Sequence, residues 1–498
     1  MFPRLHTAFD RGRREAWLFS ILAVLLVLIR SAVFLVWEHI DFDSDQAIVG
    51  LMAKHLSEFR TFPLFFYGQN YMLGVQAWFT APFFWIARPS VAMLKTPLVI
   101  LNATAAVLLI RGISGQLGLR PAFAFVAALP FIVPTPAVAG SYLETLGSSG
   151  VEPLIYMLLL WWLRGRPIAF GALLAVGFLH REFTIYGGLA LAVIGAADSS
   201  LWTRAGATAA ARWVMRMGAG FGVVWLIVDD AKLHLHGNSL LLQAQMLGRG
   251  SCFEAGTYLA TIRNMIPMTL PVLSGGRPMV LSEFATRSSA VVGSSAIGWM
   301  VAATMVLMLG RIAWLWKRGT GATDVRYGVY LALIGCCTLA VYPVACSASG
   351  MVYPIIRYLN LALLLPVGCY GIYMAVERSY RLRIAVTLAF VIWGGANLAD
   401  NVRQIRAAAV APLPNPHREL TEFLLSHQVR YARANYWDAY VVAFMSNERV
   451  IVGSFGPTRI PEYERLVDEN RDTAVHIERK PCQGWTEVAA WCIQLPAR

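Results

Sequence analysis

The sequence predicts an all-α polytopic membrane protein with about eleven transmembrane helices and a small α/β domain at its C-terminal end. Three observations predict this fold class: 57% of the 498 residues are hydrophobic, only 14% are charged, and the charges gather between long apolar runs. Globular proteins carry about 25% charged residues, so a soluble fold of this composition could not cover its surface. The net charge of +13 therefore reflects basic loops and does not indicate a nucleic-acid binder.

The first apolar run, residues 16–37, follows four arginines and is too long for the hydrophobic region of a signal peptide. We interpret it as a membrane anchor with a cytoplasmic N-terminus, in which Arg30 faces protein or reaches toward the interface. Further apolar runs predict spans at 91–110, 121–139, 152–163, 167–180, 183–197, 217–233, 290–310, 327–347, 355–376 and 384–400.

The short segments between alternate spans are basic, as in the cluster formed by Arg378, Arg381 and Arg383. Basic loops stay on the cytoplasmic side, and an odd number of spans places the tail on the other side. The sequence therefore predicts a multi-pass protein of the cell (inner/plasma) membrane whose C-terminal domain is extracytoplasmic.

Two domains are expected from this pattern. Residues 1–400 form the transmembrane domain, with long outer loops at 38–90 and 229–289, and residues 401–498 form the soluble extracytoplasmic α/β domain. The apolar stretch 75–87 is too short to span comfortably and is predicted to lie at the interface. In the tail, local patterns predict helices at 418–427 and 437–447 and strands at 431–436 and 449–453.

Cys482 and Cys492 lie in this polar tail. If the tail is extracytoplasmic, the two are predicted to form a disulfide, and the alternative is a pair of unbonded thiols.

Acidic residues gather directly after the first span, in the stretch Asp41-Phe42-Asp43-Ser44-Asp45. Three acids in five residues favour a metal, a cationic partner or a shared proton, although such clusters are often only solvated loops. A helical spacing of apolar residues begins after Asp45, so this carboxylate lies near a helix N-terminus, where its charged form is stabilised. A base held there suits proton abstraction.

The stretches 43–53, which begins Asp43-Ser44-Asp45-Gln46, and 65–72 resemble the GT-C superfamily of membrane glycosyltransferases. The resemblance is closest to the branch related to protein O-mannosyltransferases and aminoarabinose (ArnT-like) transferases. The order of spans, the pair Arg357-Tyr358, and the tail stretches 434–440 and 446–452 are also similar to that branch. The sequence departs from it at Gln46 and Gln76, where the relatives tend to have glutamate.

The resemblance implies that Asp45 is the general base. Asp43 and Asp45 could instead hold a divalent cation, which is the one cofactor that this pattern leaves open. Glu144, in a second outer loop, corresponds to another functional acid in relatives, and its alternative role is to cap a helix.

Arginines near the outer face are candidates for binding the donor phosphate, because a guanidinium grips phosphate oxygens with two hydrogen bonds. Arg357 and Arg181 are the two candidates, with Tyr358 beside the first; the alternatives are a helix-end arginine and a turn with an internal ion pair. Further residues expected to bind substrate are Tyr67, Gln69, Tyr71, His180 and Glu182.

The expected activity is therefore transfer of a sugar from a polyprenyl-phosphate donor, with inversion, to a lipid, glycan or protein acceptor on the outer face. No nucleotide-binding glycine pattern is present, which agrees with a lipid-linked donor. The competing class is a transporter or flippase for a lipid-linked sugar, although the sequence has no inverted repeat of the transporter kind. A polymerase or ligase acting on lipid-linked glycans is a further alternative.

Overall fold

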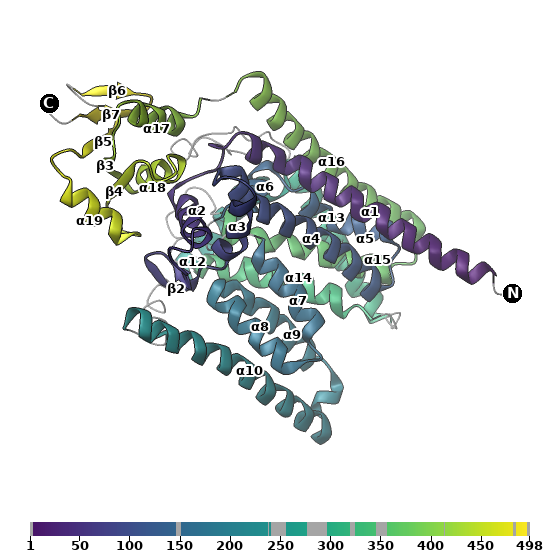
Figure 1. Ribbon diagram of the computed structural model, residues 1–498. Helices are drawn as coiled ribbons and strands as arrows, with labels where there is room; N and C mark the ends of the chain where they lie inside the picture. Colours follow the sequence, from purple (N-terminus) through teal and green to yellow (C-terminus); the bar gives the residue numbers. More distant parts are fainter. Residues whose placement is uncertain are drawn as a thin grey trace.

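Figure 1 shows the computed structural model of the chain, a bundle of helices with a small sheet-containing domain at one end. It describes residues 3–145, 151–237, 239–240, 255–275, 296–318, 324–344, 356–412, 414–481 and 485–495. The N-terminus lies at the far side of the bundle from the C-terminal domain.

Within the described residues, six helices are long and apolar enough to cross a membrane. They are α1 (Pro3–Val36), α4 (Val91–Leu117), α10 (Arg204–His236), α13 (Ala296–Lys317), α14 (Arg326–Val341) and α16 (Tyr380–Val410). Five shorter apolar helices accompany them: α5 (Pro121–Ile132), α7 (Glu152–Leu163), α8 (Pro167–His180), α9 (Ile185–Ala196) and α15 (Leu364–Val376). Each apolar run that predicted a span overlaps one of these helices.

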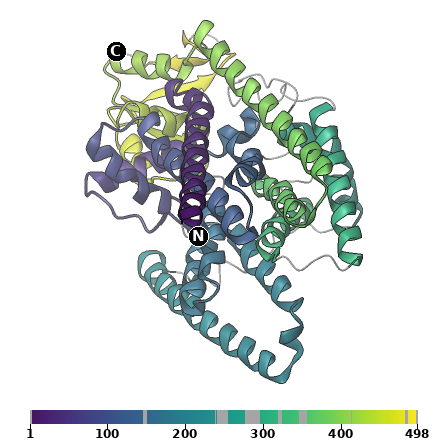
Figure 2. The same ribbon diagram turned by 90° about the vertical axis from the view of Figure 1, so that its right-hand side faces the viewer.

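Helices α8, α9 and α10 form a group on one side of the bundle, visible as the blue and teal helices in Figure 2. α10 packs along α8 at very short range because two glycines lie at the crossing. A Cβ on Gly171 would come within 1.9 Å of the Met217 carbonyl oxygen, and one on Gly220 within 2.1 Å of that of Ile168. Any larger side chain at either position would push the helices apart.

Arg30 of α1 is fully buried and faces protein, which confirms one of the two environments expected for it. Its Nη2 donates to Asn102 Oδ1 of α4 at 2.6 Å, and its guanidinium lies 5.7 Å and 5.3 Å from the ring centres of Phe131 and Tyr142. The Tyr142 hydroxyl in turn donates to the Asn360 carbonyl oxygen at 3.1 Å. A buried polar network thus connects the first span to two later segments.

The long loop 38–90 after the first span has its own structure: α2 (Ser44–Ser57), a hairpin of β1 (Phe65–Phe66) and β2 (Gln69–Leu73), and α3 (Val75–Ile86). α3 occupies the stretch predicted to be interfacial and exposes Trp78, Phe79, Trp85 and Ile86. The later loops contain α6 (Pro136–Ser141) and α12 (Ala255–Ser274). Short 3₁₀ turns complete the connections: η1 (Glu182–Thr184), η2 (Ser199–Trp202), η5 (Tyr342–Val344), η6 (Ile356–Tyr358) and η7 (Asn360–Leu363).

One predicted span begins differently from the expectation. The run 355–376 starts with the 3₁₀ turns η6 and η7, and the α-helix α15 follows only from Leu364. Asn360 explains this, because its side chain donates to Ser141 Oγ at 3.0 Å and its carbonyl oxygen accepts the Tyr142 hydroxyl. These contacts hold the segment in tighter turns than an α-helix allows.

The C-terminal domain is an α/β fold, as predicted. Its elements are α17 (Pro416–Ser426), β3 (Tyr431–Asn435), α18 (Tyr436–Met445), β4 (Ile451–Phe455), α19 (Pro461–Glu469), β5 (Val475–Arg479), β6 (Thr486–Val488) and β7 (Trp491–Gln494). The strand order is β4-β3-β5-β7-β6; β3 runs parallel to β4 and β5, and the other pairs are antiparallel. The first four elements match the predicted ones closely.

The C-terminal domain meets the loop 38–90 through α18, which packs against α2. Figure 1 shows α2 directly beside α18. Gly50 of α2 allows this packing, since a Cβ there would lie 2.5 Å from Cε2 of Phe444. The two helices share a buried apolar cluster that includes Ile48, Leu51 and Tyr440. This joint carries the candidate site.

Candidate active site

The start of α2 is fixed by Asp43, which is its N-cap. Asp43 Oδ1 accepts a hydrogen bond from the Gln46 backbone N–H at 3.1 Å, which satisfies one of the open N–H groups of the helix end. Asp45 therefore lies in the first turn, half-buried, near the positive end of the helix dipole. This is the environment that the sequence predicted for it.

Asp45 is bonded to the C-terminal domain. The Tyr436 hydroxyl of α18 donates to Asp45 Oδ1, and it accepts a hydrogen bond from Arg459 Nε at 3.2 Å. Burial and the charge of Asp45 raise the pKa of Tyr436, so the hydroxyl stays protonated and acts as the donor. Among the described residues, no group hydrogen-bonds the second carboxylate oxygen of Asp45.

Arg357 brings the predicted acids into one electrostatic environment. Tyr358 and the charges of Glu144, Asp45 and Asp43 all act on its guanidinium. The guanidinium lies 5.3 Å from the ring centre of Tyr358. Its Nε is buried without a hydrogen-bond partner in the described part of the chain, so the arginine retains a donor for a ligand.

Tyr71 of β2 lies among the same groups. Burial raises its pKa most, Arg459 lowers it, and Glu182, Tyr358 and Asp45 raise it further, so the net pKa is raised. Next to it, the Gln69 amide lies against Arg459, and its oxygen accepts from Nη2 and Nη1 at 3.0 Å and 3.3 Å in the orientation that satisfies both. The structure thus brings the predicted residues Tyr71, Gln69, Glu182 and Tyr358 to the site.

A fully buried polar layer contains Arg181 and His180. Arg181 Nη1 donates to the Met72 sulfur at 2.9 Å, and its Nη2 lies 3.4 Å from His180 Nε2, whose Nδ1 bonds the Tyr156 hydroxyl at 2.8 Å. The charges of Glu152, Glu182 and Arg357 all act on Arg181. The charge of Arg181 therefore interacts with the charged groups of the site. His180, which was predicted to bind substrate, is buried and contacts Tyr156 and Arg181.

The two glutamines that depart from the family pattern both have structural roles. Gln46 is buried; its Nε2 donates to the Asp41 carbonyl oxygen at 2.8 Å, and its Oε1 accepts from the Thr145 N–H at 3.3 Å. A glutamate could not donate to Asp41, so the amide suits this bridge, which fixes the segment next to Glu144. Gln76 of α3 donates from its amide to the buried Glu152 carboxylate.

Tyr67, another of the predicted site residues, contacts a different set of side chains. Its hydroxyl contacts His55 Nδ1 at 3.0 Å and Thr61 Oγ1 at 2.7 Å. Tyr67 and Gly68, whose φ is +69°, form the two-residue turn between β1 and β2. Tyr67 is therefore not part of the strand that carries Gln69 and Tyr71. Tyr67 therefore belongs to a second polar network.

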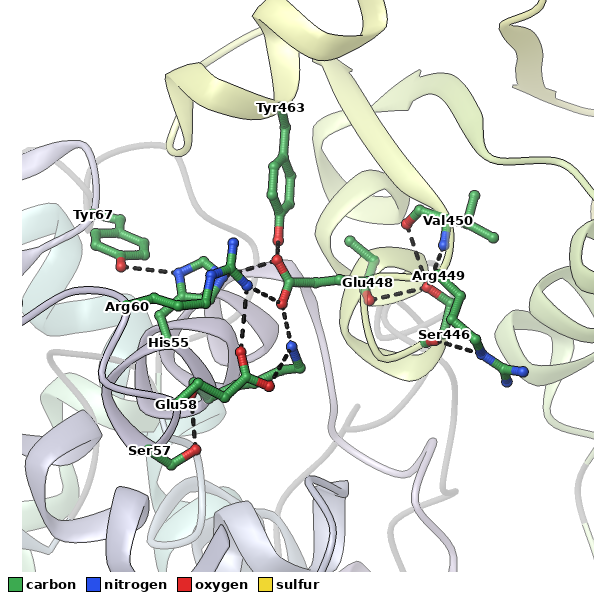
Figure 3. A network of polar contacts seen from close by, with 12 residues as sticks. His55, Ser57, Glu58, Arg60, Tyr67, Ser446, Glu448, Arg449, Val450 and Tyr463 are labelled. Atoms are coloured by element: carbon green, nitrogen blue, oxygen red, sulfur yellow. Dashed lines mark hydrogen bonds and ion pairs between the residues drawn. The ribbon is translucent and has the colours of Figure 1, made fainter. Parts of the chain in front are cut away.

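This second network, here called the Glu448 clamp, joins the C-terminal end of α2 to the C-terminal domain (Figure 3). Glu448 accepts hydrogen bonds from Lys54 Nζ, from His55 Nε2 at 2.9 Å, from Arg60 Nη1 at 2.9 Å and from the Tyr463 hydroxyl at 2.7 Å. Burial alone would raise the pKa of Glu448, but its bonds to His55, Lys54 and Tyr463 hold it well below its ordinary value. The C-terminal domain thus contacts α2 at both ends.

The predicted cation site at Asp43 and Asp45 has two acidic ligands. Among the described residues, no third His, Cys, Asp or Glu joins them to form a group that could hold a metal. Oδ1 of Asp43 caps α2 and Oδ1 of Asp45 accepts the Tyr436 hydroxyl, while the Arg357 charge lies nearby.

Sequence reasoning assigned no role to Tyr436, Arg459 or Glu448. All three lie in the domain that local patterns described only as α/β, although the stretches 434–440 and 446–452 were part of the family resemblance. Cys492 is disulfide-bonded, and Cys482 lies outside the described residues, so their pairing stays a prediction. A separate cavity of about 440 Å³ lies where β3 begins and is lined by residues that include His427, Arg430 and Tyr431.

Solved structures share the fold. The structure of ArnT from Cupriavidus metallidurans bound to undecaprenyl phosphate is 12% identical, with a TM-score of 0.52 over 94% of this chain and 97% of that chain. The apo state of the same protein is 11% identical, with a TM-score of 0.53 over 96% of each chain. No protein-family model and no curated protein matches the sequence. The chain therefore has a GT-C-like fold, as the resemblance implied.

Proposed function

We propose that this chain is an integral-membrane glycosyltransferase that moves a sugar from a polyprenyl-phosphate donor to an acceptor on the outer face of the membrane. The observation that carries the proposal is that the charges of Asp43, Asp45 and Glu144 all act on Arg357, whose Nε is buried without a hydrogen-bond partner in the described part of the chain. A carboxylate base near a half-buried arginine suits transfer from a sugar phosphate.

In the proposed reaction, the second oxygen of Asp45 takes the proton of an acceptor hydroxyl. The acceptor oxygen attacks the anomeric carbon, and the bond between that carbon and the phosphate oxygen breaks. The electron pair leaves with the polyprenyl phosphate, whose added charge Arg357 stabilises, with Arg181 behind it. One displacement with one base inverts the anomeric centre.

The nature of the donor is supported by the shared fold. The ArnT structure with that fold is bound to undecaprenyl phosphate, and Arg357 has a buried donor atom suited to such a phosphate. The half-buried side chains of Tyr71 and Gln69 and the exposed side chain of Glu182 are then available to the sugar. The acceptor is a lipid, a glycan or a protein.

The orientation in the membrane is part of the proposal. We place the N-terminus in the cytoplasm, and the acids and the C-terminal domain outside, because the basic short segments at 378–383 and before the first span favour the cytoplasmic side. The α/β domain beyond α16 then covers the outer end of the site.

The test uses purified protein in liposomes with undecaprenyl-phosphate-linked hexose, pentose and aminopentose as probes, and an envelope extract as acceptor. We expect Asp45→Asn to fold normally and to lose transfer by about 10²–10⁴-fold, the usual contribution of a general base. The matched control is Asp472→Asn, which changes an exposed aspartate of the C-terminal domain. Full activity in the Asp45 variant would refute the assigned base.

The same assay separates this proposal from transport. A flippase moves the lipid-linked sugar across the bilayer with the sugar–phosphate bond intact, whereas a transferase releases undecaprenyl phosphate. Movement of the probe without release of the carrier, for every probe sugar, would favour the transporter.

A further inference from the structure

The candidate base receives its hydrogen bond from a residue 391 positions later in the chain. Tyr436 begins α18 and donates to Asp45 Oδ1, and Arg459 donates from Nε to the same hydroxyl at 3.2 Å. A cation, a hydroxyl and a carboxylate thus form a continuous chain of hydrogen bonds. Such charge-assisted bonds are stronger than neutral ones.

Arg459 is itself fixed from both sides. Its backbone N–H donates to the Tyr440 hydroxyl at 2.7 Å, and its Nη1 donates to the Gly68 carbonyl oxygen at 3.1 Å. Gly68 has a φ of +69°, and a Cβ there would lie 2.8 Å from Arg459 Cδ. The hairpin turn of the loop 38–90 and α18 therefore hold the guanidinium between them.

We infer that Tyr436 and Arg459 are positioning residues for Asp45, and that the C-terminal domain thereby completes the catalytic site. This inference rests on the proposed function, in which Asp45 is the base. With one oxygen held by Tyr436, the carboxylate cannot rotate freely, and the oxygen without a partner faces the acceptor. Proton abstraction depends on such fixed geometry.

The helix joint supports the same role. Gly50 lets Phe444 approach α2 closely, and the Glu448 clamp holds the other end of that helix. α2 is 14 residues long, about 21 Å at 1.5 Å per residue, and the C-terminal domain contacts it along this whole length. The position of Asp45 is thus set by the domain as a whole, with Tyr436 as its direct contact.

The experiment compares Tyr436→Phe with Tyr431→Phe in the full-length protein, using the undecaprenyl-phosphate-linked sugars named above. Both changes remove one tyrosine hydroxyl from the C-terminal domain. Tyr431 is the first residue of β3, whereas Tyr436 directly follows the last residue of that strand. We expect Tyr436→Phe to lower kcat by about tenfold to a hundredfold, the effect of one hydrogen bond to a charged group, with KM for the donor unchanged.

A second readout is the pH–rate profile. The Tyr436 hydroxyl favours the charged form of the carboxylate, so its removal is expected to move the acidic limb of the profile to higher pH. Loss of fold alone would lower the rate at every pH without moving the limb. Arg459→Lys is expected to keep part of the activity that Arg459→Met loses, because lysine retains a charge but not the forked geometry.

The outcomes separate the two levels of the argument. Loss of activity in Asp45→Asn, together with a Tyr436→Phe variant whose kcat and pH limb match those of Tyr431→Phe, overturns the positioning role and leaves the proposed function intact. Full activity in Asp45→Asn overturns the proposed base and this inference with it. A lowered kcat with a moved limb supports both.

Discussion

Glu448→Gln is the substitution whose effect on stability follows most directly from the structure. It keeps the size of the side chain and one carbonyl acceptor but removes the negative charge from the clamp. Lys54 and His55, whose side chains are 7% and 4% exposed, would then be buried without that carboxylate. The contact between α2 and the C-terminal domain should weaken as a result.

The magnitude follows from the environment of each cation. Removing one partner of a buried ion pair costs about 3–5 kcal/mol. The lower end applies here, because Glu58 remains 2.8 Å from Lys54 and the Arg60 side chain is 41% exposed. A loss of about 3 kcal/mol corresponds to roughly a hundredfold increase in local opening.

Hydrogen exchange read by mass spectrometry measures this opening in detergent or liposomes. Peptides that cover the C-terminal half of α2 and the end of α18 should exchange roughly a hundredfold faster in Glu448→Gln. The control is Glu469→Gln, which removes an exposed partner of Arg465 on α19 and should change little. Equal exchange in the two variants would refute the assignment of Glu448 as the residue that holds α2.

Acid should act in the same direction. Because the pKa of Glu448 is lower in the folded protein than its ordinary value of 4.5, the clamp contributes fully above about pH 4.5 and loses strength as the pH falls below it. Exchange in the same peptides, corrected for the intrinsic rate, should therefore rise in the wild type below pH 4.5 and not in Glu448→Gln.

Two further substitutions test packing. Gly50→Ala should weaken the α2–α18 joint by about 1–3 kcal/mol, because the added methyl group overpacks against the buried Phe444 ring. The control is Gly115→Ala on α4, where a Cβ meets open space and no weakening is expected. Equal hydrogen exchange of the α2 peptides in both variants would contradict the close packing. Arg30→Ala should lower the free energy of unfolding by about 3 kcal/mol, because it leaves a cavity and an Asn102 oxygen without its donor. Thermal unfolding in detergent measures this loss, and the control is Arg14→Ala, which changes an exposed arginine of the same helix.

Local patterns predicted the parts of the fold that depend on local sequence. The apolar runs coincide with helices, and the helical spacing after Asp45 correctly placed that carboxylate in the first turn of α2. The tail elements up to β4 were predicted for the same reason. The 3₁₀ turns before α15 were not, because they depend on the contact between Asn360 and Ser141, which lie 219 residues apart.

The site was predictable only where the family resemblance supplied the pairing. Arg357 and the acids are far apart in sequence, and no periodicity connects them. Tyr436 lies in the stretch 434–440 of the family resemblance, but no local pattern assigned a role to it or to Arg459, because only the fold brings these two side chains to Asp45. Tyr67 lies with Gln69 and Tyr71 in the stretch 65–72 of the family resemblance, but it precedes the turn at Gly68 and its hydroxyl contacts His55.

The long sequence separation between Asp45 and Tyr436 also sets an order of assembly during synthesis. At about 5–20 residues per second, the ribosome needs roughly 20–80 s to add the 391 residues between them. Throughout that interval the nascent polypeptide has its acidic cluster but not the hydroxyl that donates to Asp45. A truncated translation product that ends before residue 436 would therefore leave this carboxylate without the hydrogen bond that the C-terminal domain supplies.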